Sequence, residues 1–262
     1  MRDTNEAVII TTTQDPSRIG VEHHRAYLPS TLEDYQPCIP LFDVLHAAGP
    51  EDTVTMIING DGGWVTTASH LATAVSRSQA TVVTEVYGRA SSAHTLTMLC
   101  GDIILPVRNA IVMSHNMSMG SFGSGEEPIK HVEASLKWAY SLFEEYHLPF
   151  LSMSELESIF EYNNTIWLSD EEDINNRIFT TMWLRAAIGN LKDNALDIFL
   201  AFFKAGAYEG CQLVHLDTLV EFICQTEEVE VAPIWKDMEH AGLFGDTRNP
   251  MDYIDSLTKE EN

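Results

Sequence analysis

The pattern of apolar and polar residues predicts short strands alternating with helices as far as about Trp183. Runs rich in β-branched residues at 8–13, 53–59 and 81–87 predict strands. Between the last two runs, the apolar residues of 64–78 recur at the spacing of one helix face. Repeated strand and helix units of this length predict an α/β fold.

The alternation continues through the middle of the chain. Residues 88–92 combine a glycine with two serines and predict a tight corner before a helix at 93–100. Apolar runs at 103–106 and 110–115 predict two more short strands. A glycine- and serine-rich stretch then precedes a long amphipathic helix that ends before Pro149.

Helical periodicity dominates the remainder of the chain. Two Ser-x-x-Glu patterns predict helix starts as capping boxes, Ser154 with Glu157 and Ser169 with Glu172. Beyond Gly189 apolar residues recur at helical spacing, in the group Leu191, Ala195, Ile198, Leu200, Phe202 and Phe203, and in the group Leu213, Leu216, Leu219, Val220, Phe222 and Ile223. We therefore expect an N-terminal arm at 1–20, an α/β domain at 21–188 and a helical C-terminal extension at 189–262.

Charge and composition exclude several classes of partner. The 39 acidic residues outnumber the 15 Lys and Arg residues, which gives a formal net charge of −24. Such a chain repels phosphate backbones and anionic lipids, and no cluster of basic residues offsets this. No apolar run reaches the roughly 18 to 20 residues that cross a bilayer. We expect neither nucleic acid nor a membrane as partner.

The cysteines and histidines show no metal-binding or disulfide pattern. The four cysteines, Cys38, Cys100, Cys211 and Cys224, have no C-x-x-C spacing, and the ten histidines are dispersed. The polar start of the chain lacks the features of a secretory signal, which favours a cytoplasmic protein with buried free thiols. We assign no metal and expect no cofactor.

Three segments carry candidate chemistry. The glycines of 58–63 follow a strand and can aim backbone N–H groups at an oxyanion. The corner at 88–93 places a serine at a helix N-terminus, where it serves either as a nucleophile or as an ordinary N-cap. The strand at 110–115 ends in His115, which taken alone is more typical of a core or edge residue than of a catalytic base.

In order and spacing the three segments resemble the Clp protease proteolytic subunit (ClpP-like) family of the crotonase-like superfamily. Its motifs I-N-S-P-G-G, G-x-A-x-S-M and M-I-H are matched by I-N-G-D-G-G at 58–63, G-R-A-S-S-A at 88–93 and M-S-H at 113–115. Residues 167–172 resemble a fourth motif, F-[LM]-[ST]-A-x-E. The resemblance covers roughly 25–177 and implies a ClpP/crotonase-like spiral of short strand and helix units.

The resemblance also implies a serine peptidase mechanism. Ser92 falls on the nucleophile and His115, 23 residues later, on the general base. The backbone N–H groups of Gly63 and Ala93 would then hold the oxyanion. Ser91 offers a second hydroxyl, and Asp61 replaces a proline of the motif with a carboxylate that we expect to oppose the oxyanion charge.

The third triad position departs from the family. Thr165 stands where the family has aspartate, and Asn164 is a possible substitute that would orient the imidazole without charge. Losing the carboxylate lowers the rate by about 10⁴ in a standard triad. Two functions therefore stay open, a serine endopeptidase of reduced activity and a scaffold of the same shape without turnover.

Further alternatives concern the biological setting. The family forms stacked rings, so we expect a homo-oligomer acting on peptides or unfolded proteins, with an ATP-dependent unfoldase as a possible partner. Phage head-maturation proteases share this shape. A crotonase-type acyl-CoA enzyme is a weaker alternative, because the Ser92 and His115 pair and the lack of a basic patch for CoA phosphates argue against it.

Overall fold

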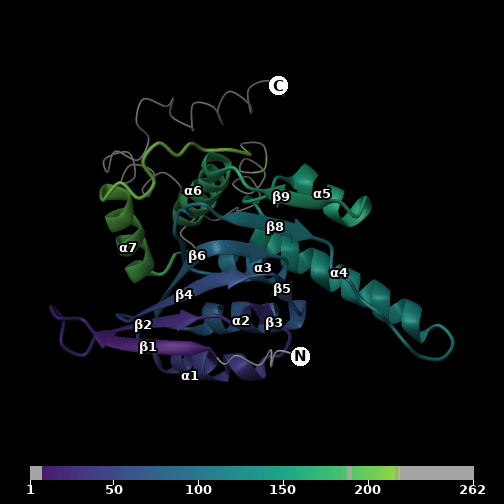
Figure 1. Ribbon diagram of the computed structural model, residues 1–262, viewed down its shortest axis with the longest axis horizontal. Helices are drawn as coiled ribbons and strands as arrows, with labels where there is room; N and C mark the ends of the chain where they lie inside the picture. The colour runs from purple at the N-terminus through teal and green to yellow at the C-terminus, as the bar shows by residue number, and fades with distance from the viewer. Residues whose placement is uncertain (1–7, 188–190, 216–217, 219–262) are drawn as a thin grey trace.

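The computed structural model describes residues 8–187, 191–215 and 218, which form one mostly parallel sheet with helices packed around it (Figure 1). Two strand pairs at the edges are antiparallel, and the pairs β2–β4, β4–β6 and β6–β8 between them are parallel. The strand order is β1-β2-β4-β6-β8-β9, with β7 paired to β6. The strands are β1 (Ile9–Gln14), β2 (Glu22–Tyr27), β4 (Thr53–Gly60), β6 (Thr81–Ser91), β7 (Ile103–Ile104), β8 (Ile111–His115) and β9 (Thr165–Leu168).

The parallel strands place the candidate chemistry at one edge of the sheet. Because β4, β6 and β8 run in the same direction, their carboxyl ends meet at the same edge. Gly60 ends β4, Ser91 ends β6 and His115 ends β8. A second, two-stranded sheet pairs β3 (Thr31–Leu32) with β5 (Gly62–Gly63) directly after β4.

Helices bury the sheet in two large hydrophobic clusters. One cluster includes apolar residues of α1 and α2 against β2 and β4, and the other includes residues of α6 and α7 against β6, β7 and β8. The helices are η1 (Gln36–Cys38), α1 (Ile39–Ala47), α2 (Val65–Arg77), α3 (Ala93–Leu99), α4 (Glu127–His147), α5 (Met153–Glu161), α6 (Glu171–Ala187) and α7 (Asp193–Lys204). The α/β prediction is confirmed.

Several local predictions differ from the structure. Strand β6 continues through Gly88 as far as Ser91, so the predicted corner is confined to Ser92. Strands β2 and β9 and helix α1 were not predicted. Strand β2 was missed because its sequence, E-H-H-R-A-Y, has only two buried positions, so little of the strand carries an apolar signal.

Both predicted capping boxes are wrong by one or two residues. Helix α5 starts earlier, with Ser152 as its N-cap: the Ser152 hydroxyl accepts from the Glu155 N–H, and Glu155 accepts from the Ser152 N–H. At the start of α6, the Asp170 carboxylate accepts from the Asp173 N–H at 2.9 Å. Nearby Ser, Asp and Glu residues compete for the cap, and the backbone path chooses among them.

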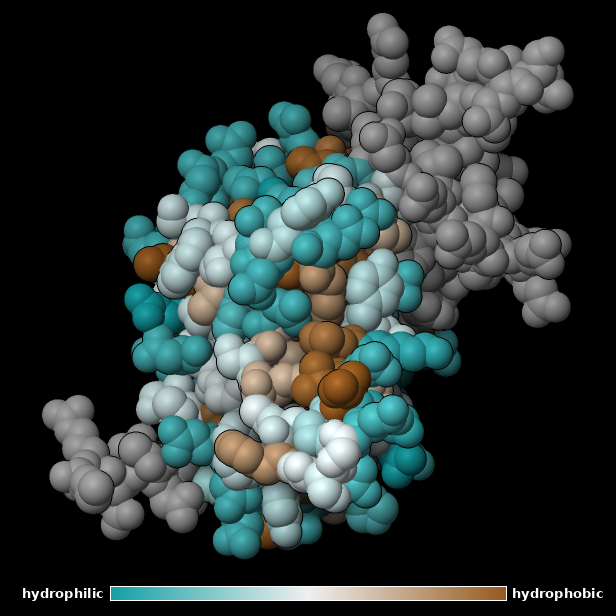
Figure 2. Space-filling view, turned by 90° about the vertical axis from the view of Figure 1, so that its right-hand side faces the viewer, coloured by the Kyte–Doolittle hydropathy of each residue, from teal (hydrophilic) through white to brown (hydrophobic). Residues whose placement is uncertain are grey.

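Helix α4 projects from the body of the molecule (Figure 1). Its inner apolar residues Ala139, Leu142 and Phe143 are buried, whereas Ile129 and Trp138 are exposed, as is Phe122 in the loop before it. Figure 2 looks onto the side toward which α4 projects and shows hydrophobic surface gathered in the middle of that face. Every helix of the described residues is too short or too polar to cross a membrane.

The first part of the C-terminal extension packs on the α/β core. Helix α7 forms where the sequence predicts helix, and its Phe199 side chain is buried. Beyond it, the Tyr208 hydroxyl donates to the carbonyl oxygen of Ile104 at 2.8 Å. Ahead of the helix, the Lys192 ammonium lies 2.7 Å from the Asp102 carboxylate. These contacts fasten the extension to β7 and its neighbours, while the three-part division of the chain stays a prediction.

Residues 211–215 are not helical, contrary to the prediction for Leu213. They lie along α6, where Asn176 accepts from the Gln212 N–H and Thr180 from the Val214 N–H, each at 2.8 Å. The side chains of Asn176 and Thr180 are one helical turn apart and satisfy alternate amides of an extended segment. The rest of the predicted helical pattern, from Leu216, and the N-terminal residues 1–7 lie outside the described residues, apart from Thr218.

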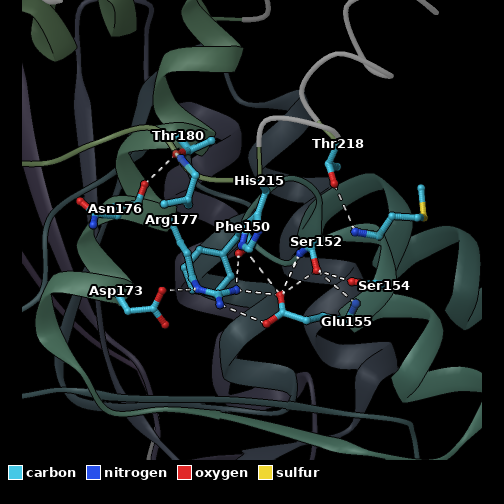
Figure 3. Close-up of polar contacts among 12 residues, drawn as sticks. Phe150, Ser152, Ser154, Glu155, Asp173, Asn176, Arg177, Thr180, His215 and Thr218 are labelled. Carbon is cyan, nitrogen blue, oxygen red and sulfur yellow. Dashed lines mark hydrogen bonds and ion pairs between the residues drawn. The ribbon is translucent and has the colours of Figure 1, made fainter. Parts of the chain in front are cut away.

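An ion-pair network lies beneath this segment. The buried Arg177 guanidinium bonds both carboxylate oxygens of Glu155, at 2.8 and 3.0 Å, and also bonds Asp173 (Figure 3). The His215 imidazole lies 3.8 Å from Glu155. Desolvation of Glu155 opposes its ionisation, but hydrogen bonds from Arg177 and Ser152 outweigh it and lower the pKa of the carboxyl. The network joins α5, α6 and the extension.

Candidate active site

The corner between β6 and α3 is built around Ser92. Its backbone has φ 55° and ψ −121°, a conformation that non-glycine residues seldom adopt. The Ser92 N–H donates to the carbonyl oxygen of Met113 on β8 at 2.7 Å. The Thr95 hydroxyl lies 2.8 Å from the same Met113 oxygen and 2.9 Å from the carbonyl oxygen of Ala90. These bonds hold the strained corner against β8.

The structure brings the Ser92 and His115 side chains together. Ser92 Oγ lies 2.9 Å from His115 Nε2. Although Ser92 occupies the N-cap position of α3, its side chain does not cap the helix. The hydroxyl is therefore available to the histidine. The neighbouring Ser91 hydroxyl is buried and, among the described residues, has no hydrogen-bond partner.

The surroundings of the His115 imidazole favour its neutral form. It is half-buried, and burial lowers its pKa below the ordinary value of 6.5 by disfavouring the imidazolium. The ring is consequently neutral at pH 7. A neutral ring that is protonated on Nδ1 presents an acceptor at Nε2, the atom that faces Ser92 Oγ.

The glycines of β5 lie between Ser92 and strand β3. A Cβ on Gly62 would come within 2.7 Å of the Ser92 Cβ, and one on Gly63 within 2.5 Å of the Leu32 backbone. Both glycines have positive φ, 112° and 142°. Next to them, Ala93 is the first residue of α3, so its N–H has no acceptor within the helix. The Gly62 backbone and the first residue of α3 thus meet beside Ser92, since a Cβ on Gly62 would also lie 3.3 Å from the Ala93 nitrogen.

The Asp61 carboxylate does not stand unpaired beside this turn. Its Oδ1 lies 2.5 Å from Nη1 of Arg89, and both side chains are largely exposed. The ion pair and the surrounding solvent reduce the field of the carboxylate, so the expected opposition to an oxyanion is smaller than the sequence indicated.

The third triad position is incomplete. Thr165 stands directly opposite His115 in the antiparallel β8–β9 ladder, as the resemblance implies. Thr165 and Asn164 are both exposed, and the Asn164 N–H donates to the carbonyl oxygen of Ser158. Within 8–187, 191–215 and 218, no side-chain hydrogen bond or ion pair joins His115 to either residue or to a carboxylate. No side-chain group among the described residues orients the Nδ1 atom of His115.

Two residues of the site were not singled out by sequence reasoning. Arg89 neutralises Asp61, and the buried His94 accepts the Gly62 N–H on its Nδ1 at 2.9 Å. The only local signal is their place within the 88–93 motif or just after it. Both pairings join residues about 30 positions apart, which only the folded chain reveals.

No metal or disulfide chemistry is apparent in the described part of the chain. No group of three or more His, Cys, Asp or Glu side chains there is placed to hold a metal ion. Cys38, Cys100 and Cys211 are free thiols, and the first two are buried. Burial raises the pKa of the Cys38 thiol to about 11, which keeps it protonated and unreactive. Cys224 lies outside the described residues.

Comparison with known proteins agrees with the geometry. Residues 29–150 match the model of the Clp protease family. The matched range contains Ser92, His115 and both glycines of β5, but it ends before β9 and therefore before Thr165. No curated protein matches the chain.

Proposed function

Residues 29–150 belong to the Clp protease family, and on this premise we propose that the protein is a serine-type endopeptidase with Ser92 as its nucleophile. The observation that carries the proposal is the 2.9 Å contact between Ser92 Oγ and His115 Nε2. It occurs at a strained corner whose hydroxyl is not used to cap the helix. The family assignment makes a peptidase the natural reaction class.

The proposed mechanism is acyl transfer. His115 Nε2 accepts the Ser92 proton as Oγ attacks the carbonyl carbon of a peptide bond. The N–H groups of Gly63 and Ala93 donate to the resulting oxyanion. His115 then gives its proton to the departing amine, which leaves an ester on Ser92. Water, deprotonated by His115, attacks this ester and releases the acid product with the free hydroxyl.

The open Nδ1 side of His115 implies slow turnover. During both attacks the ring becomes imidazolium, and a carboxylate at Nδ1 would stabilise that charge. Thr165, which stands opposite His115 on β9, carries no charge, and Asn164 is the alternative orienting group. We therefore infer an activity below that of a complete triad.

A catalytically impaired scaffold is the second candidate. It is favoured by one observation: Thr165 and Asn164 are exposed, and among the described residues neither makes a side-chain hydrogen bond to His115. A crotonase-type acyl-CoA enzyme is disfavoured, since the Ser92 to His115 contact is not required for that chemistry. The proposal leaves two biological settings open. One is a cellular enzyme that works with an ATP-dependent unfoldase, and the other is a phage head-maturation protease.

The proposed assembly is a homo-oligomeric ring in the cytoplasm that acts on peptides or unfolded proteins. The exposed apolar side chains Ile129 and Trp138 on α4 and Phe122 before it support an oligomer. An apolar surface of this kind commonly marks a contact between protein chains.

Labelling with a fluorophosphonate probe tests the proposal on the full chain, because only an activated hydroxyl reacts. We expect labelling of Ser92, with complete loss in Ser92→Ala and no loss in the matched variant Ser91→Ala. Absence of labelling in the folded native protein would favour the scaffold. Labelling of Ser91 instead would show that the nucleophile is misassigned.

A further inference from the structure

The imidazole of His94 joins the turn after β4 to the loop before β3. We propose that His94 is a positioning residue that holds the Gly62–Gly63 turn beside the nucleophile, an inference that rests on the proposed function. His94 is fully buried in the first turn of α3, two residues after Ser92. It contacts neither Ser92 nor His115 through a hydrogen bond and would act through the turn.

The two hydrogen bonds of the ring define its protonation. The Gly62 N–H, which can only donate, lies 2.9 Å from Nδ1. Nδ1 must therefore be the acceptor, so the proton resides on Nε2 and is donated to the Pro29 carbonyl oxygen at 3.0 Å. Burial lowers the pKa of His94 and favours this neutral form. Both nitrogens are thus satisfied by backbone groups.

The ring also fills the space above Gly60. A Cβ on Gly60 would lie 2.4 Å from His94 Cε1 and 2.6 Å from both His94 Nε2 and the Ser30 carbonyl oxygen. A larger residue at position 60 would displace the imidazole or the adjacent backbone. The motif that 58–63 resemble has serine at this position, whereas in this chain the His94 ring on α3 fills the space next to Gly60.

The bond to Gly62 decides which amide can serve the reaction. Because the Gly62 N–H is occupied by His94, the amide of Gly63 is the one left for an oxyanion. The Gly62 backbone also packs against Ser92, where a Cβ would approach the Ser92 Cβ to 2.7 Å. A shift of this turn would therefore move the proposed oxyanion donor relative to Oγ. Displacements of about 1 Å in such positioning groups lower rates by about 100-fold.

Two amide substitutions separate the two bonds of the ring. In His94→Asn the side-chain oxygen reaches the position of Nδ1 and can accept from Gly62, whereas in His94→Gln the amide reaches the position of Nε2 and can contact only Pro29. We expect His94→Gln to lower kcat of peptide hydrolysis by about 10- to 100-fold with little change in KM. His94→Asn should retain most of kcat, although both variants lose the imidazole.

An NMR measurement tests the inference without relying on activity. In the native protein His94 should show the Nε2–H tautomer, and the Gly62 amide should be protected from hydrogen exchange. Protection should persist in His94→Asn and fall in His94→Gln. An Nδ1–H tautomer, or equal Gly62 protection in the two variants, would overturn the inference. Native protein with these NMR properties but without fluorophosphonate labelling would instead overturn the proposed function alone.

Discussion

The two sides of the His115 ring differ sharply in how they are built. On the Nε2 side, Ser92 lies at the end of an interior parallel strand and is fixed by backbone bonds to β8. On the Nδ1 side, Thr165 begins the edge strand β9 and is exposed. The difference shows that an interior position is constrained by the fold itself. A position on a solvated edge can change with little effect on stability.

Edge position gives a physical reason why the proposed third triad position can vary while the residues around Ser92 are constrained. Gly62 and Gly63 each lack room for a single added carbon, so substitution there disturbs the packing. Thr165 and Trp167 alternate outward on β9 and face solvent. Replacing aspartate by threonine at such a site removes chemistry without opening a cavity.

Removing the proposed base, His115, should have the largest effect on the rate of peptide hydrolysis. We expect His115→Ala to lower kcat by a factor on the order of 10⁴ or more, because Ser92 loses its proton acceptor. Ser114→Ala on the same strand is the matched control, since its buried hydroxyl has no partner among the described residues. Peptide hydrolysis by purified full-length protein measures both. Undiminished turnover in His115→Ala would mean that another group is the base.

A carboxylate at position 165, on the Nδ1 side of His115, should raise the rate of peptide hydrolysis. Thr165→Asp is expected to raise kcat at least about tenfold, within the roughly 10⁴ that the carboxylate contributes in a standard triad. Thr165→Asn has nearly the same shape without charge and should give little gain. If Asn164→Ala instead lowers activity and Thr165→Asp has no effect, Asn164 is the orienting residue.

A buried ion pair extends the comparison of interior and edge positions to stability. Arg177→Met leaves the partly buried Glu155 without its partner and should lower the unfolding free energy by about 3 kcal/mol. Arg18→Met removes the exposed pair with Glu51 and should change stability far less. Urea titrations followed by circular dichroism compare the two. Equal losses of unfolding free energy in the two variants would show that burial does not determine how much each ion pair contributes.

The smallest expected effect of the missing carboxylate is a shift in the pH profile of kcat/KM. His115 must be neutral to act as base, so activity falls as the pH decreases through its pKa. Since burial lowers that pKa, the acid limb of kcat/KM should lie below 6.5. Thr165→Asp stabilises the imidazolium and should move the limb to higher pH, whereas Thr165→Asn should not. A native limb above 6.5 would indicate an anionic neighbour of His115.

Local patterning was enough to predict most of the strands and helices that carry the candidate site. β-Branched runs marked β1, β4 and β6, helical periodicity marked α2 and α4, and the three motifs placed Ser92 and His115. The prediction succeeded because each of these features is encoded in a few consecutive residues. A parallel sheet then brings together the carboxyl ends of strands that run in the same direction.

The tertiary structure alone decided the contacts between distant segments. Periodicity cannot show that the His94 ring occupies the space of a side chain on Gly60, or that Arg89 pairs with Asp61. It also did not show that 211–215 leave the helical pattern to lie on α6. The sequence determined most of the strands and helices, because these depend on local conformational preference. Packing decided which polar groups are satisfied by which partners, because burial and hydrogen bonding depend on atoms that meet only in the folded chain.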